Sequence, residues 1–146
     1  MRHPAPVLLA LLLCACGGEP KSPPAEVAAA PPRVGEEPSL FDGDLDARGT
    51  EPFWGLKIRA DGLTISRPGA EDIRAPNPGL VEADDTAVWT TTLDGQPLIV
   101  TITDNGPCSD GMSDLRYAFV AQMVIGTETL TGCAFRTGEP PAQPAP

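Results

Sequence analysis

Apolar and polar residues alternate with a period of two along three pairs of short segments, and this pattern constrains the fold of the 146-residue chain more than any other feature. Each pair is joined by a turn that contains glycine. The pairs are residues 54–59 with 63–66, 89–93 with 98–103, and 117–125 with 129–135. Such alternation across a glycine turn is typical of β-hairpins. The sequence therefore predicts an antiparallel, all-β domain.

Weaker strand patterns occur at residues 44–49 and around Ile73 or 80–83, which brings the expected number of strands to about eight. A sheet in so small a domain must cover its edges or close on itself, and a barrel is the complete solution. We therefore expect a small antiparallel barrel, with a β-sandwich as the alternative. The large apolar residues of 117–125 favour a filled interior over a ligand cavity.

The N-terminus has the pattern of a secretory signal peptide, because a short positive region precedes the apolar run of residues 7–13. This run is too short for a transmembrane helix, which needs about 20 residues. Leu13-Cys14-Ala15-Cys16 resembles the bacterial lipobox, in which the cysteine after the cleavage point becomes lipidated. Cys16 fits that role better than Cys14, which follows the bulky Leu13. We expect residues 1–15 to be removed; cleavage that leaves Cys16 as a free thiol is the alternative.

An acylated Cys16 would make the membrane a partner of the protein and hold it at the bacterial cell envelope. In the pattern known from enteric bacteria, an Asp directly after the cysteine retains a lipoprotein in the inner membrane. Gly17 stands there instead. The resemblance therefore implies the outer membrane, with the protein facing the periplasm.

Proline, alanine and charged residues dominate both ends of the remaining chain, so we expect a disordered tether over 16–40 and a disordered tail over 137–146. Between them, residues 41–136 form a single domain by length. This domain has 7 Lys and Arg against 15 Asp and Glu, a formal charge of 7 minus 15, or −8. Such a surface repels nucleic acid and suits a cationic protein, another envelope component, or solubility alone.

Two cysteines remain in the domain, Cys108 and Cys133, and an even pair in an exported protein predicts one disulfide. It would close a loop of about 25 residues and stabilise the fold by about 3 kcal/mol. The single histidine, His3, lies in the signal segment, so the usual Cys/His zinc sites are excluded. We expect no metal and no cofactor.

The stretch Cys108-Ser109-Asp110-Gly111-Met112-Ser113-Asp114 gathers a thiol, two hydroxyls and two carboxylates. It does not match a calcium loop, since Gly and Cys occupy ligand positions, and no histidine is near to act as a base. A structural role explains the residues better. Ser109 or Asp110 would cap a short helix, Gly111 would take a positive φ, and Ser113 or Asp114 would close the turn.

Gly49-Thr50-Glu51-Pro52-Phe53-Trp54 places a carboxylate and two aromatic side chains at the start of a strand. Trp54 continues the inward-facing set of that strand, so we expect it in the core. Stacking of Phe53 or Trp54 on a ligand, with Glu51 as a polar partner, is the alternative. We predict no catalytic residues. Candidate binding residues are Glu51, Phe53, Trp54, Asp110, Ser113 and Asp114.

The three motifs GTEPFW, CSDGMSD followed by tyrosine, and Gly132-Cys133-Ala134 occur in this order across about Leu45 to Phe135. In this the chain resembles an uncharacterised family of bacterial envelope lipoproteins built around those motifs. In that family the domain occurs alone or beside META-type (HslJ-like) modules and domains similar to the inhibitors of c-type lysozyme. The resemblance implies an envelope setting and a non-enzymatic character.

The leading hypothesis is a non-enzymatic outer-membrane lipoprotein whose β-domain binds a partner or supports the envelope. One specific form is inhibition of a cationic muramidase, a c-type lysozyme, by the acidic domain. The rival is a hydrolase that uses Asp110, Asp114 or Glu51, which would need one carboxylate held protonated.

Overall fold

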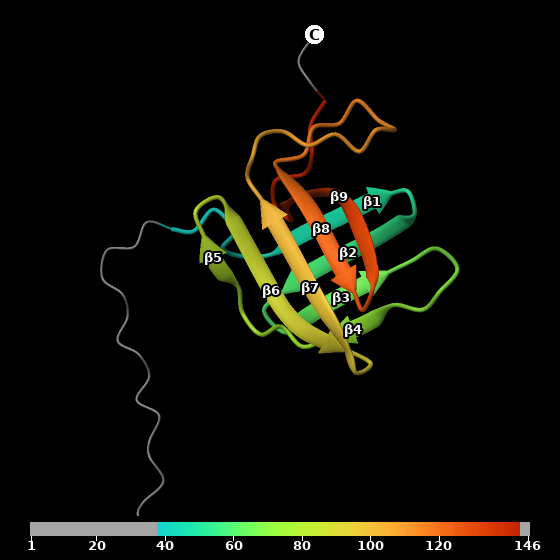
Figure 1. The fold of residues 1–146 in the computed structure, drawn as a ribbon. Coiled ribbons are helices and arrows are strands. Elements are labelled where there is room, and N and C mark those ends of the chain that lie inside the picture. Colours follow the sequence, from blue (N-terminus) through green and yellow to red (C-terminus); the bar gives the residue numbers. More distant parts are fainter. Residues whose placement is uncertain (1–37, 144–146) are drawn as a thin grey trace, which may run out of the picture. The chain divides into compact units, whose positions relative to one another are not determined.

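The computed structural model describes residues 38–143, which form nine β-strands and no helix (Figure 1). The strands are β1 Leu45–Thr50, β2 Phe53–Arg59, β3 Gly62–Ser66, β4 Ile73–Ala75, β5 Val81–Ala83, β6 Thr86–Leu93, β7 Gln96–Thr103, β8 Phe119–Ile125 and β9 Glu128–Arg136. Both weak candidates, around Ile73 and at 80–83, form strands. The count is therefore nine instead of about eight.

All strands belong to one antiparallel sheet with the order β4-β3-β2-β1-β9-β8-β7-β6-β5. Every strand pairs with the next strand in sequence except β4, which does not pair with β5. In addition, the first strand pairs with the last, β1 with β9. The sheet curls so that β4 comes close to β6 (Figure 1). The predicted all-β, barrel-like fold is confirmed, as a curled sheet with a seam between β4 and β5.

The three predicted hairpins are β2–β3, β6–β7 and β8–β9. The β6–β7 turn shows why the hairpins could be predicted. A tight turn between twisted strands requires positive φ, and Asp-Gly is a residue pair that accepts it; Asp94 and Gly95 have φ of 49° and 78°. Several strand boundaries differ from the prediction: β6 starts at Thr86 and β7 at Gln96, two or three residues earlier than expected. Strand β8 starts at Phe119, since Tyr117 forms an isolated bridge with Cys108 instead of continuing the strand.

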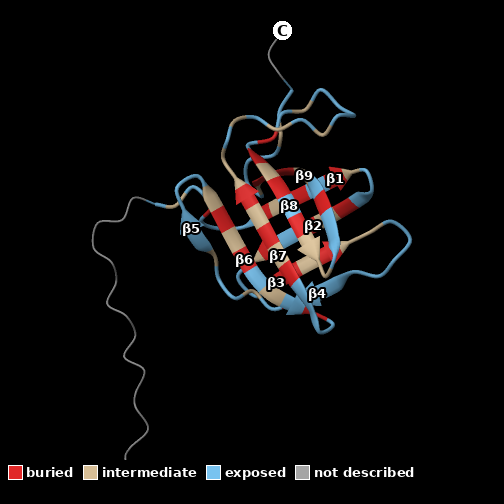
Figure 2. Ribbon diagram, in the orientation of Figure 1, coloured by how far each residue is buried: buried red, intermediate tan, exposed pale blue. Residues whose placement is uncertain are grey.

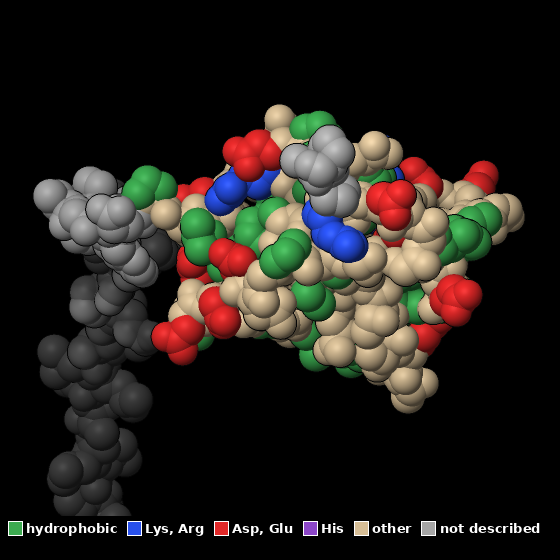
Figure 3. Space-filling view, turned by 90° about the horizontal axis from the view of Figure 1, so that it is seen from above, with side chains coloured by type: hydrophobic (Ala, Val, Ile, Leu, Met, Phe, Trp, Pro, Cys, Tyr) green, Lys and Arg blue, Asp and Glu red, His purple; other side chains and the backbone are tan. Residues whose placement is uncertain are grey.

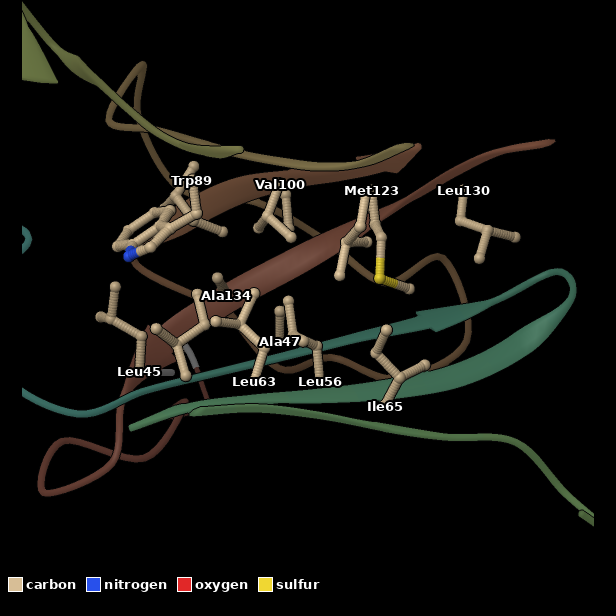
Figure 4. Close-up of a cluster of buried hydrophobic side chains, with 14 of the residues drawn as sticks. Leu45, Ala47, Leu56, Leu63, Ile65, Trp89, Val100, Met123, Leu130 and Ala134 are labelled. Carbon is tan, nitrogen blue, oxygen red and sulfur yellow. The ribbon is translucent and has the colours of Figure 1, made fainter. Parts of the chain in front are cut away.

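The inward-facing side chains of the strands fill the space inside the curled sheet. Buried and exposed residues alternate along the strands (Figure 2). In Figure 4 the side chains of Leu45, Leu56 and Ile65 point toward those of Trp89 and Met123 from the opposite strands, and all five are buried. Burial of this apolar set is the main force that closes the sheet.

A second, smaller cluster lies on the outer face of β9. It consists of Tyr117, Cys133 and Phe135, with the half-buried Cys108 and Leu115 packed against them. Residues 104–118, which connect β7 to β8, cover this face and form the projecting loop at the top of Figure 1. The domain therefore has an extra layer outside the sheet, and that layer builds the candidate site.

The ends of the domain reach further than the sequence indicated. Arg116 and Ala142 exchange backbone hydrogen bonds of 2.9 and 3.3 Å, and the Thr137 hydroxyl donates to Asp46. Residues 137–143, expected to begin a disordered tail, are thus held at Thr137 to the start of β1 and at Ala142 to the loop. The signal peptide, Cys16 and the tether up to residue 37 lie outside the described residues. Within 38–143 no helix has the length and apolar character needed to cross a bilayer.

Candidate functional site

The three sequence motifs meet at one place on the outer side of β1. GTEPFW forms the turn from β1 to β2, the CSDGMSD stretch lies in the loop from β7 to β8, and GCA lies in β9, which pairs with β1. The hydroxyl of Thr50 donates to the backbone carbonyl of Asp110 at 2.9 Å and joins the first two motifs. Segments remote in sequence thus build a single structure.

The predicted disulfide between Cys108 and Cys133 is present, and it joins the loop to β9. Its Cα atoms are 5.7 Å apart. Backbone hydrogen bonds of 3.0 Å in both directions between Cys108 and Tyr117 close the base of the loop. The eight residues between Cys108 and Tyr117 are therefore held at both ends.

Asp110 organises the tip of the loop with its carboxylate. One oxygen accepts the backbone N–H groups of Ser113 and Met112 at 2.8 and 3.0 Å, and the other accepts the hydroxyls of Ser113 and Tyr117 at 2.8 and 2.9 Å. The bonds from Ser113 and Met112 are the main reason why the pKa of Asp110 lies far below its usual range. The charged carboxylate is thus part of the loop structure.

This arrangement corrects one detail of the sequence prediction. No helix forms at Ser109 or Asp110; the loop is a series of side-chain-capped turns instead. Ser109 accepts the N–H of Gly111, and the Ser113 hydroxyl accepts the N–H of Leu115. Gly111 takes the expected positive φ of 74°. These side chains accept hydrogen bonds from nearby backbone N–H groups, as predicted, but they do so within turns and not at the start of a helix.

Tyr117 and Arg48 connect the loop to the sheet. The guanidinium carbon of Arg48 lies 5.9 Å from the ring centre of Tyr117 and 5.1 Å from that of Phe135, within cation–π range. Burial raises the pKa of Tyr117, and its hydrogen bond to Asp110 acts in the same direction, whereas the charge of Arg48 opposes both. The tyrosine is therefore a neutral donor at physiological pH.

Glycines at two motif positions allow β1 and β9 to approach closely. A Cβ at Gly132 would overlap the backbone carbonyl of Arg48, and one at Gly49 would overlap the indole of Trp54. That indole N–H donates to the carbonyl of Thr131 at 3.2 Å. Gly49 of GTEPFW and Gly132 of GCA are therefore both needed for the close approach of β1 to β9.

A groove of about 870 Å³ runs between the outer face of β1, β2 and β3 and the wall formed by the loop. Its floor is Gly55, which pairs with Arg48 on one side and Ser66 on the other. The residues that line it from the sheet include Asp46, Arg48, Thr50, Phe53, Gly55, Lys57, Ser66 and Arg67, and those from the loop are Asp110, Met112, Ser113, Leu115 and Tyr117. A smaller hollow of about 390 Å³ lies on the other side of the loop tip, beside Glu51 and Gly132.

The structure separates the predicted binding residues. Phe53 is 53% exposed at the groove, whereas Trp54 is buried, with 4% of its surface exposed. Only Phe53 of the two aromatic residues is free to stack on a ligand. Glu51 borders the smaller hollow, and Asp114 lines neither space.

Sequence reasoning missed most residues that line the groove, and Arg48, Lys57 and Gly55 are examples. These three are on the outer face of β1 or β2, opposite the apolar set that identified the strands. The alternation itself placed them outside, but nothing local showed that the loop would fold over this part of the sheet. Their role depends on the pairing of β1 with β9.

Within residues 38–143 no group of three His, Cys, Asp or Glu side chains is arranged to hold a metal ion. No protein-family model, no curated protein and no solved structure matched the chain.

Proposed function

We propose that the domain is a non-catalytic binding module, that its ligand occupies the groove beside the loop, and that acylated Cys16 holds it at the bacterial outer membrane. The observation that carries the binding role is a preformed groove with one wall locked by a disulfide and by Asp110. Binding sites are usually concave, largely preformed and lined by apolar groups with a few polar ones. The lipobox pattern supports the location.

The rigidity of the wall supports binding because a site that is already ordered loses less conformational entropy when it takes a ligand. Here the loop has no apolar core of its own beyond Leu115 and Tyr117. It is nevertheless fixed by a covalent bond, by four hydrogen bonds to one carboxylate, and by Arg48 on the aromatic rings. Such reinforcement exceeds what a simple connection between two strands needs.

The geometry argues against Asp110 as the general acid of the hydrolase hypothesis. A carboxylate that acts as general acid needs a raised pKa, whereas the pKa of Asp110 is lowered by its donors. Both of its oxygens are also engaged within the loop. Asp110 is therefore a structural anion.

Photo-crosslinking tests the proposed function in living cells. The photoreactive amino acid benzoylphenylalanine replaces Phe53 in the groove or, as the control, Val81, which is 72% exposed on the edge strand β5. We expect an adduct of defined mass at position 53 and none at position 81. Equal labelling at both positions, or no adduct at position 53, would overturn the proposal.

Muramidase inhibition is a separate form of the binding hypothesis, which the acidic surface of the domain favours. Titration of the purified protein into a c-type lysozyme assay at low salt tests it. Turnover that stays unchanged at a large excess of the protein removes this form and leaves the groove proposal in place.

A further inference from the structure

We infer that the ligand of the groove is an anionic amphiphile, a single-chain molecule with a phosphate or carboxylate headgroup and an apolar tail. This inference rests on the proposed function and specifies the class of ligand. It follows from the charges, the stacking of Arg48 and the exposed apolar side chains at the groove.

Four of the seven basic side chains in the described domain are paired with acids. Of the three that are not, Arg48 and Lys57 line the groove and Arg116 does not. Arg59, Arg67, Arg74 and Arg136 each lie 2.7–3.7 Å from a carboxylate oxygen. Among the ion pairs of residues 38–143, none involves Arg48 or Lys57. In a domain with a formal charge of 7 minus 15, or −8, an unpaired cation is a scarce feature, and both of these line the groove.

The two carboxylates that line the groove already have donors. Asp46 accepts from Arg59 and from the hydroxyl of Thr137, each at 2.8 Å, and Asp110 accepts four bonds within the loop. Arg67 also lines the groove, but it is paired with Glu128 at 2.7 Å, as Asp46 is with Arg59. The unpaired charges of the lining are therefore two cations, Arg48 and Lys57, against one carboxylate, Asp110, so the formal charge of the groove is positive. Figure 3 looks down on the face that carries the loop, and acidic side chains lie at many points around it. The positive groove thus lies in negative surroundings, which favours a compact anionic headgroup over an extended acidic chain.

Arg48 is positioned to bind such a headgroup. Its guanidinium lies over Tyr117 and Phe135, and no hydrogen bond among the described residues uses it as a donor. A stacked guanidinium keeps its planar N–H groups available and suits bidentate contact with phosphate or carboxylate. Lys57 adds a second, exposed cation on the neighbouring strand.

The apolar part of the ligand has its own contacts. Phe53 and Met112 are 53% and 66% exposed, from the sheet side and the loop side of the groove respectively. Phe53 and Lys57 flank Gly55 along β2, about 7 Å to either side of it. Arg48 lies opposite Gly55 at the middle of the groove, and Lys57 lies at the end away from Phe53, with Asp46 opposite it. The apolar end is therefore followed by the two cations. This is the polarity of an amphiphile.

Calorimetric titration of the purified protein with decyl phosphate below its micelle concentration tests the inference. The matched probes are decyl maltoside, decyltrimethylammonium and inorganic phosphate. We expect saturable binding of decyl phosphate and, for each other probe, binding at least about tenfold weaker, because each lacks either the anion or the chain.

The variants Arg48→Gln and Lys57→Gln should each weaken binding of decyl phosphate, by about tenfold for Arg48. Arg74→Gln, which removes the same charge from a side chain 70% exposed outside the groove, should leave it unchanged.

Two results would overturn the inference. One is equal binding of decyl maltoside and decyl phosphate with no effect of Arg48→Gln, which would leave the groove as a site for uncharged ligands and the proposed function intact. The other is no binding of decyl phosphate together with a crosslink at position 53 to an acidic peptide or an uncharged molecule. Loss of that crosslink itself contradicts the proposed function, so the two failures are distinguishable.

Discussion

Asp110 is the residue on which the conformation of the loop depends most. Its carboxylate belongs to a half-buried residue and accepts four hydrogen bonds that a neutral acid would accept less well. A group whose pKa is lowered by folding contributes stability above its unfolded pKa and loses it as the pH falls through the folded value. The order of the loop should therefore depend on pH only in strong acid.

We predict that the amide signals of Met112 and Ser113 in NMR spectra stay constant from neutral pH down to about 4, the usual range of a free Asp, and move only well below it. Asp110→Asn should abolish this transition and speed up hydrogen exchange at both amides without unfolding the sheet. Movement of both signals near pH 4 in the unchanged protein would contradict the role given to Asp110.

Gly132 is a second residue whose identity follows from a close approach. Alanine there would place a methyl group against the carbonyl of Arg48, which belongs to a paired strand and cannot move freely. We expect Gly132→Ala to lower the free energy of unfolding by about 1–3 kcal/mol, the usual cost of overpacking. Gly138→Ala, where no atom lies within 4 Å, is the control. Urea denaturation compares the two; equal stability would show that β1 and β9 are further apart.

At the scale of elements, the loop from β7 to β8 acts as a unit because the disulfide fixes it to β9. Replacing both Cys108 and Cys133 with alanine should lower the free energy of unfolding by about 3 kcal/mol, as expected for the loop of 25 residues that the bond closes. It should also weaken decyl phosphate binding, since the wall of the groove loses its anchor. Calorimetry below the melting transition separates the two effects. A double variant with unchanged stability and binding would show that the loop is held by its hydrogen bonds alone.

The elements differ in how far the sequence determined them. The hairpins β2–β3, β6–β7 and β8–β9 could be predicted because alternation and turn residues are local signals. The path of the loop could not, since it depends on contacts of Thr50 with Asp110 and of Arg48 with Tyr117, far apart in sequence. The motif residues were recognised as unusual from their types and spacing. Arg48 and Lys57, in contrast, look in the sequence like ordinary outward-facing strand residues, and only the pairing of β1 with β2 shows that they lie side by side.

At the scale of the molecule, the seam between β4 and β5 is the weak part of the sheet. Each of these strands has three residues and one paired neighbour, and their burial is the lowest of all strands. Native-state hydrogen exchange should therefore be fastest among the strands in β4 and β5 and slowest in β8 and β9. Slow exchange in β5 would indicate that the barrel closes further than the strand pairing shows.

The central claim is that this domain recognises its ligand in the groove between β1, β2, β3 and the loop. Chemical-shift mapping during titration with decyl phosphate tests it most directly. We predict saturable shifts at the amides of Arg48, Gly55 and Met112 and none at Val81 or Glu82 in β5. Shifts confined to the β4–β5 seam, or spread over the whole sheet, would contradict the claim.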